Sequence, residues 1–418
     1  MAKITERVYP FALIAVFFLF ILLFLSVVRT SIFGAVSEDK HLFFEITLLL
    51  LIAVLAELAF SYVKQPTVII LLVLGILMSK SVLGFDIIRD QHLLEIFAQL
   101  GAIFLLFRVG LHSHLTKVFS KENLVVAAFG VIVPFIIGYY YASFSGGSFA
   151  YSMFLGAALT ATSVGVTVAI LKELKVLEKK FSEVIIGAAV IDDILGLLVL
   201  AFVINAPNGI TGEAIVPMLG VAATAAIFLA GGVIAGKAFV REILDKLPSD
   251  NKNFLLSLSF LFIYAYIAEY IGLSSIIGAF LAGMILNYSR HVKELEDKIY
   301  ALDVIFVPIF FISLGMLVDV SVLSAIAIPA LIITVIAILS KVVGCGLGAV
   351  ASKIPKYDSL LIGVGMSPRG EVALIVALIG LTKGALTSGE YALISAMALL
   401  TTLFAPPVLN WMIKRMKQ

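Results

Sequence analysis

Apolar residues occupy this chain in long blocks of roughly 18–25 residues, separated by short polar segments. As a helix, a block of that length spans a hydrocarbon core about 30 Å thick. The strands of a membrane β-barrel would instead alternate apolar and polar positions over about ten residues, which these continuous blocks do not do. The pattern therefore predicts an all-α polytopic membrane protein.

The blocks divide into fourteen candidate spans, of which the third and tenth are short. They cover approximately residues 10–30, 42–63, 66–80, 93–111, 122–144, 149–171, 182–205, 213–239, 253–271, 273–289, 297–318, 322–350, 356–382 and 388–414. The first block runs for about 19 apolar residues after a basic start, whereas the apolar region of a signal peptide has about 7–15. We interpret residues 1–40 as an extra N-terminal transmembrane segment, with a cleaved signal as the alternative.

Lysine and arginine are distributed unequally between alternate connections, and this asymmetry sets the expected orientation. With a cytoplasmic N-terminus, the cytoplasmic side holds the basic segments 171–180, 241–252, 289–298, 352–356 and 414–417. The opposite side holds only Arg29, Lys40, Lys80, Arg89 and Lys383. We therefore expect a multi-pass protein of the cell (inner or plasma) membrane, surrounded by lipid, with a cytoplasmic C-terminus. Topology accounts for the basic loops, so they indicate no nucleic-acid partner.

Composition excludes several classes of function. The chain is 62% hydrophobic and 13% charged, against about 25% charged residues in soluble domains. Its single cysteine, Cys345, excludes an internal disulfide framework and a multi-cysteine metal site. The sequence contains no nucleophile–base pair with plausible spacing, so we expect neither an enzyme nor a cofactor.

Two spans carry helix-breaking segments, one in each half of the chain. The sixth contains "GAALTATSVGVTVAIL" (156–171), which includes Thr162 and Ser163, and the thirteenth contains "GVGMSPRGEVALIVAL" (363–378), which includes Pro368. Proline removes a backbone donor, and irregular backbone persists in a membrane only where protein buries it or it lines a cavity. Paired interrupted spans indicate an inverted-repeat transporter with its site near the membrane midplane.

Ionisable residues at bilayer depth indicate function, and the first candidates are Asp192 and Asp193 in "GAAVIDDILGLLVLA". Neighbours on a helix point about 100° apart, so the two aspartates address two partners or adjacent walls of one cavity. Apolar surroundings let such carboxyls hold protons near neutral pH. Deprotonated, they are hard oxygen ligands for a monovalent cation such as Na⁺. The alternative is a structural carboxyl pair held by hydroxyl groups.

Three further charges lie within predicted spans. Lys341 is too far from either end of span 322–350 to reach the interface and needs an anionic partner, for which Asp192 is the candidate. A static salt bridge is the alternative to a role in proton release. Arg369 and Glu371 flank the break at Pro368, where we expect them to compensate helix dipoles, with ion ligation as the alternative. Thr162 and Ser163 would either supply ligand oxygens or bond back to their own helix.

Four segments carry a resemblance to a known family. "TATSVGVT", "GAAVIDDILGL", "AILSKVVG" and "GMSPRGEVALI" are similar to signature segments of the cation:proton antiporter-2 family. Over about residues 42–414 the chain resembles NapA-type bacterial Na⁺/H⁺ antiporters. Residues 1–40 depart from that pattern, because they give fourteen spans where thirteen are expected.

The resemblance implies an inverted-repeat antiporter fold with two crossed discontinuous helices and about 13–14 transmembrane helices. Residues 42–111 and 253–318 would form the dimerisation (scaffold) domain of a homodimer. Residues 122–205 and 322–414 would form the ion-translocating core domain, and residues 213–239 a linker helix.

The resemblance also implies electrogenic Na⁺(Li⁺)/H⁺ antiport by alternating access. Asp193 matches the family's cation ligand, Asp192 its lysine-paired acid and Lys341 the lysine. More protons than cations would cross, so the membrane potential would contribute about 2.3 kcal/mol per net charge per 100 mV. The nearest alternative is a K⁺/H⁺ antiporter of the same family. A sodium-coupled organic-anion symporter and a non-transporting sensor are the others, and ion flux separates all four.

Overall fold

The computed structural model describes residues 42–63, 67–84, 86–88, 91–113, 118–205, 215–247, 251–317 and 326–416. The predicted first span, and with it the segment 1–40, lies outside the described residues. Within those residues every regular element is a helix, which confirms the prediction of an all-α membrane protein.

The described helices match the predicted spans from residue 42 onward. Among the described residues, nine helical segments are long and apolar enough to cross a membrane, one of them the interrupted segment Phe149–Glu173, and four shorter apolar helices accompany them. The elements are α2 (Leu42–Val63), α3 (Thr67–Leu77), α4 (Lys80–Leu83), α5 (Gln91–Leu111), α7 (Lys121–Phe144), α8 (Phe149–Thr160), α9 (Val164–Glu173), α10 (Lys180–Ile204), α11 (Ile215–Glu242), η3 (Leu244–Lys246), α12 (Asn251–Tyr270), α13 (Ser275–Leu286), α14 (Val292–Met316), α16 (Ala327–Ala351), α17 (Lys356–Gly365), α18 (Glu371–Thr382) and α19 (Ser388–Met416).

Both predicted helix breaks are present. The sixth span divides at residues 161–163 into α8 and α9, and the thirteenth divides at residues 366–370 into α17 and α18. Most boundaries differ from the prediction by a few residues, and the clearest case is α14, which begins at Val292, inside the segment 289–298 that we expected to be a polar loop. That segment is charged but contains no glycine or proline, so the helix continues beyond its apolar part.

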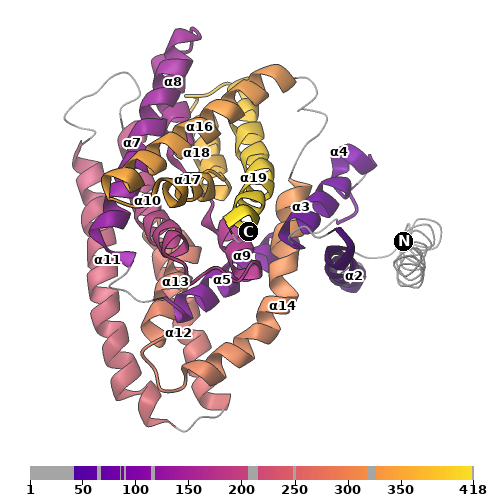
Figure 1. Cartoon of the computed structure of the whole chain (residues 1–418), viewed down its shortest axis with the longest axis vertical. Helices are drawn as coiled ribbons and strands as arrows, with labels where there is room; N and C mark the ends of the chain where they lie inside the picture. Colours follow the sequence, from indigo (N-terminus) through magenta and orange to yellow (C-terminus); the bar gives the residue numbers. More distant parts are fainter. Residues whose placement is uncertain are drawn as a thin grey trace.

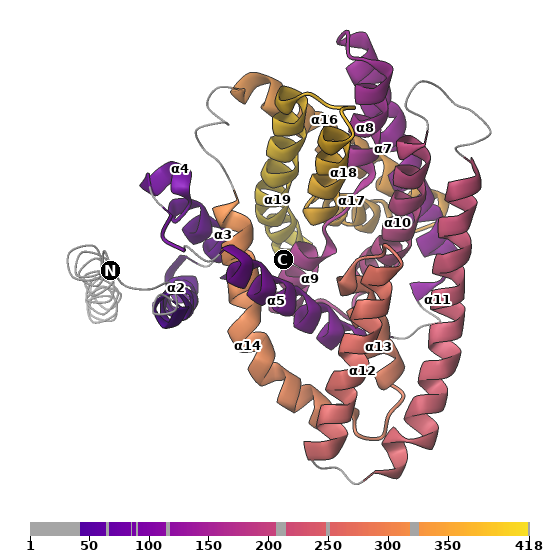
Figure 2. The same cartoon turned by 180° about the vertical axis from the view of Figure 1, so that it is seen from behind.

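Two groups of helices pack among themselves. In the α5 group, α5 contacts α13 and α14, α14 also contacts α3, and α12 packs on α13. In the α7 group, α7 contacts α8, α10 and α16, while α18 contacts α8 and α19. Helix α11 contacts α10 of the second group and α13 of the first, and α9 contacts α3 and α5. Figures 1 and 2 show most of the α7 group in the upper half of the view, with α12 and the start of α14 reaching the bottom. Assignment of the α5 group to a dimer interface stays a prediction.

Glycines let backbones of the α5 group come into contact. A Cβ atom on Gly283 of α13 would lie 2.2 Å from the carbonyl oxygen of Phe107 on α5. Its counterpart on α5, Gly110, would place a Cβ atom 2.3 Å from the carbonyl oxygen of Phe280. Close approach through small residues is how membrane helices associate without a hydrophobic driving force between them. The α5–α13 contact therefore depends on two facing glycines.

We predict that Gly283→Ala destabilises the protein, because the added methyl group collides with backbone that cannot yield as a side chain would. Overpacking of this kind costs about 1–3 kcal/mol. Thermal unfolding in detergent should show a lower Tm for Gly283→Ala than for Gly220→Ala. Gly220 is the matched control, because a Cβ atom on this glycine of α11 has no neighbour within 4 Å. Equal Tm values would contradict the packing account.

Candidate functional site

The two helix breaks lie against each other and satisfy each other's backbone groups. Ser163 donates its backbone N–H to the carbonyl oxygen of Pro368 at 2.8 Å. The Thr167 hydroxyl donates to the carbonyl oxygen of Gly365 at 2.6 Å. A helix end leaves carbonyl groups without intrahelical partners, and leaving such groups unpaired in a membrane is costly. Contact between the breaks removes part of that cost and fixes the crossing.

Lys341 of α16 is fully buried and makes three hydrogen bonds with its ammonium group. Its Nζ atom donates to Asp192 Oδ1 at 2.8 Å, to the Thr160 carbonyl oxygen at 2.6 Å and to the Gly130 carbonyl oxygen at 2.9 Å. The predicted contact between Lys341 and Asp192 is confirmed. Because Thr160 ends α8, the ammonium group also lies at the negative end of that helix dipole.

Arg369 supplies a second buried cation at the same helix end. Its Nη2 atom donates to the carbonyl oxygen of Leu159 at 2.8 Å, and its Nη1 atom donates to the carbonyl oxygen of Ser367 at 2.5 Å. The guanidinium group therefore joins the end of α8 to the break that follows α17. This geometry fits the expected compensation of helix dipoles. The side chain of Glu371, the other residue in that expectation, lies outside the described residues.

The two aspartates of α10 occupy different environments. Asp192 is 1% exposed and faces α7 and α16, and its Oδ2 atom has no hydrogen-bond partner among the described residues. Asp193 is half-buried and lines a cavity between the two helix groups. The carboxyl group of Asp192 thus contacts the Lys341 ammonium group, and that of Asp193 lines the cavity. This is one of the two arrangements that helix geometry allows.

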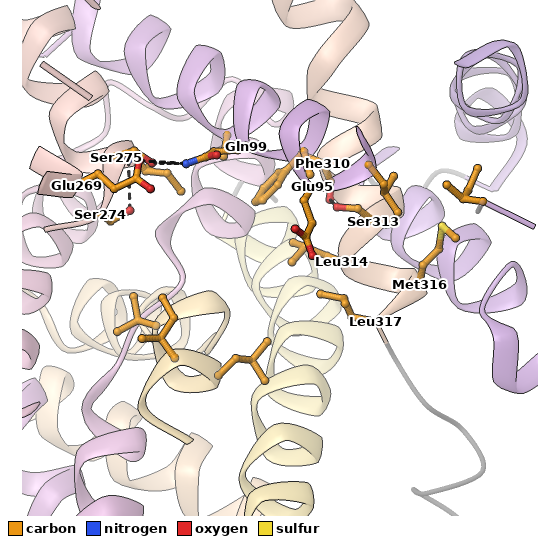
Figure 3. Close-up of a pocket in the computed structure, with 18 of the residues that line it drawn as sticks. Glu95, Gln99, Glu269, Ser274, Ser275, Phe310, Ser313, Leu314, Met316 and Leu317 are labelled. Atoms are coloured by element: carbon orange, nitrogen blue, oxygen red, sulfur yellow. Dashed lines mark hydrogen bonds between the residues drawn. The ribbon is translucent and has the colours of Figure 1, made fainter. Parts of the chain in front are cut away.

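The cavity has a volume of about 1110 Å³. Its walls come from α5, α10, α14 and α18, and from the connections between α3 and α5 and between α12 and α13. Figure 3 shows Glu95 of α5 projecting into it, with Gln99, Glu269 and Ser275 together at one end. Gln99 Nε2 donates to Ser275 Oγ at 3.2 Å across that end. The cavity therefore gives water-sized species a route to Asp193.

A smaller cavity surrounds Asp193 on the side of the breaks. Thr162, Ser163 and Gly165 line it, together with Phe310 of α14. The Thr162 hydroxyl donates to the carbonyl oxygen of Met366 at 3.3 Å, so its oxygen keeps lone pairs for another partner. The structure thus brings Thr162, Ser163 and Asp193 to one cavity, but their roles as ligands stay predictions.

Sequence reasoning missed several groups that hold the site together. The Thr401 hydroxyl accepts the backbone N–H of Arg369 at 3.0 Å, and the Thr402 hydroxyl donates to the Arg369 carbonyl oxygen. Gly130 must lack a side chain, since a Cβ atom there would lie 2.6 Å from Cys345 Sγ. Adjacent threonines in the apolar span 388–414 were the available signal. The role of the Gly130 carbonyl had no signal, because it depends on which helix packs against α16.

The site combines oxygen atoms with buried cations. Asp193, Asp192, Thr162 and Ser163 carry the side-chain oxygens, which suit protons and hard monovalent cations. Lys341 balances the charge of Asp192, and Arg369 lies at the same helix end. Such an arrangement can bind and release small cations without covalent chemistry.

The sequence matches a known family over most of its length. The model of the family "Sodium/hydrogen exchanger, transmembrane" matches residues 46–415. The Na⁺/H⁺-K⁺ antiporter GerN of Bacillus cereus is 35% identical over 382 residues, which cover 89% of this chain and 96% of GerN. The high-affinity Na⁺/H⁺ antiporter NhaS3 of Synechocystis sp. is 37% identical over 333 residues, covering 77% of this chain and 72% of NhaS3.

The fold matches a solved structure as well. The sodium proton antiporter MjNhaP1 from Methanocaldococcus jannaschii aligns with a TM-score of 0.67, covering 89% of this chain and 96% of that chain. Sequence identity is 17%, so the likeness concerns the fold alone. The expected antiporter fold is confirmed by this match.

We predict that Lys341→Met lowers thermal stability, because it leaves the buried Asp192 carboxylate without its cation. Breaking a buried ion pair by removing one partner costs about 3–5 kcal/mol. The double variant Asp192→Asn with Lys341→Met should lose less stability than the two single variants added together. Tm values of all four proteins in detergent test this. Additive losses would contradict the energetic coupling of the pair.

Proposed function

The chain belongs to the sodium/hydrogen exchanger family, and on that premise we propose that it is an electrogenic Na⁺(Li⁺)/H⁺ antiporter of the cell membrane. It carries Na⁺ or Li⁺ one way and protons the other through the paired-aspartate site. The observation that carries this proposal is that two adjacent aspartates of α10 lie in different environments. Asp193 lines a cavity, while the adjacent Asp192 is buried against Lys341.

Exchange follows from competition for one set of oxygens. A protonated Asp193 is neutral and cannot bind Na⁺, whereas a deprotonated Asp193 is a hard anionic ligand. Each cation that binds must therefore displace a proton. Thr162 and Ser163, on the wall of the same small cavity, supply neutral oxygens that replace water around the cation. Antiport requires nothing more than this competition, provided that the site opens to one side at a time.

Lys341 makes the exchange electrogenic in this proposal. When a cation attracts Asp192, the Lys341 ammonium group loses its anionic partner, and a buried lysine without a partner releases its proton. More than one proton then leaves for each cation that binds. The membrane potential would contribute about 2.3 kcal/mol per net charge per 100 mV to transport.

The orientation predicted from the basic loops indicates which side of the membrane the cavity faces. It places the α3–α5 and α12–α13 connections outside and the C-terminus in the cytoplasm. The cavity that reaches Asp193 is lined by both of those connections, so it faces outward. We assign the α7 group (122–205 and 322–414) to the moving core and the α5 group (42–111 and 253–318) to a homodimeric scaffold, with α11 as the linker.

K⁺/H⁺ exchange is the second candidate, because the relative GerN is named for K⁺ as well as Na⁺. Selectivity depends on the geometry of the oxygens around the ion. Proton flux in proteoliposomes with a preset pH gradient separates the candidates. Collapse of the gradient by Na⁺ and Li⁺ supports the proposal, and collapse by K⁺ alone moves it to potassium. No response to any of the three ions, in folded protein, would contradict antiport.

We predict that Asp193→Asn abolishes cation-dependent proton flux while the protein still folds, because an amide can neither exchange a proton nor neutralise the cation. The same proteoliposome assay measures the loss, which should exceed about 100-fold, or 2.7 kcal/mol. Asp297→Asn is the control, since this exposed residue lies near the other end of α14 from the cavity. Normal flux in Asp193→Asn would overturn the site assignment.

A further inference from the structure

The last turn of α9 carries a lysine that reaches across to the α5 group. Lys172 Nζ donates to Asp303 Oδ2 of α14 at 2.5 Å. Arg108 of α5 donates to the same oxygen from its Nη1 atom at 2.7 Å. The Asp303 side chain is only 7% exposed, so one buried carboxylate of α14 is shared between a cation of α9 and a cation of α5.

The next residue of α9 makes a second contact with the α5 group. Both carboxylate oxygens of Glu173 accept the backbone N–H of Thr67, at 2.9 Å and 2.8 Å. Thr67 begins α3, and a helix N-terminus favours a negative charge. Consecutive residues of one core helix are thus tied to α14 and to α3.

These contacts lie on the side of the interface away from the cavity. The cavity is lined by the beginning of α5 and the end of α14, whereas Arg108 is near the end of α5. Between them Phe310 packs against Gly165, with a closest approach of 3.4 Å from a Cβ atom built on that glycine. The two helix groups are therefore open to each other at one end and tied together at the other.

We propose that Lys172 and Glu173, with Asp303, Arg108 and Thr67, form a latch that closes the cytoplasmic side while the outer cavity is open. The inference rests on alternating access in the proposed function. The latch must break each time the core moves to open inward. The strength of its polar contacts therefore helps to set the balance between outward-open and inward-open states.

The composition of the latch suits repeated opening. When Lys172 departs with the core, Asp303 keeps Arg108 as its partner, so no buried carboxylate is left without a cation. The Lys172 side chain is 27% exposed and needs only a modest change to become fully hydrated. Separating an isolated buried pair would leave a buried charge without a partner, whereas a shared carboxylate avoids most of that penalty.

The test measures how often the cytoplasmic side opens. Leu106 of α5 is 2% exposed and lies 4.0 Å from a Cβ atom built on Gly165, so it is covered while the latch is closed. Leu106→Cys in a Cys345→Ala background provides a single thiol, because the chain has one natural cysteine. The rate of maleimide labelling of the purified full chain in detergent then reports the inward-open population.

We predict that Lys172→Met and Asp303→Asn each raise the labelling rate by roughly fivefold or more. Each variant removes a contact that stabilises the outward-open state, so the population of the inward-open state rises. Lys172→Arg should restore the slow rate by keeping the charge. Lys298→Met is the matched control, since Lys298 pairs with Glu294 of α14 and lies over the Phe254 ring of α12, so its contacts stay within the α5 group.

Unchanged labelling in both latch variants, in protein with normal Tm, would overturn the latch even if Na⁺/H⁺ exchange is normal. The latch is supported if both variants are labelled faster while the Lys298→Met control is labelled at the rate of the parent protein. This holds whichever ions drive flux. Labelling therefore tests the latch and flux tests antiport, so either proposal can be contradicted while the other holds. A rise in Lys298→Met equal to that in Lys172→Met would also overturn the latch, since it would indicate general loosening.

Discussion

Two helices end inside the membrane, and the carbonyl groups at those ends must find donors. The end of α8 is met by the side chains of Lys341 and Arg369, and the break after α17 is met by Ser163, Thr167 and Arg369 itself. The positions of both cations therefore follow from the need of these carbonyl groups for hydrogen-bond donors, independently of any transported ion. Because two positive charges then lie at one depth, the site tolerates carboxylates that an apolar interior would otherwise exclude.

The paired aspartates acquire different tasks from this arrangement. Asp192 is fixed by Lys341, and Asp193, one residue further along α10, faces the cavity. A carboxylate that lines a cavity, next to one whose charge is already matched, is suited to alternate between proton and cation. Helix α9, which begins at this crossing, also contacts α3 and α5 and bonds to α14, so the site and the contact with the α5 group share one helix.

Much of this organisation could be predicted from the sequence. Apolar block length located the spans from residue 42 onward, hydroxyl-rich and proline-containing segments located both breaks, and a lysine far from either span end pointed to Asp192. What depends on the packing of distant helices could not be predicted. Nothing near Gly130 indicated that its carbonyl group would accept a hydrogen bond from Lys341. Asp303 was missed because it lies where the polar start of α14 meets its apolar part, and its partners Arg108 and Lys172 come from other helices.

In the proposed exchange, one set of carboxylate oxygens holds either a proton or a monovalent cation. Calorimetric titration of Na⁺ into the purified protein, repeated in buffers with different ionisation enthalpies, counts the protons released on binding. We expect proton release with each bound Na⁺ and an apparent Na⁺ affinity that falls as pH is lowered. Saturable Na⁺ binding with the same heat in every buffer and no dependence on pH would contradict it.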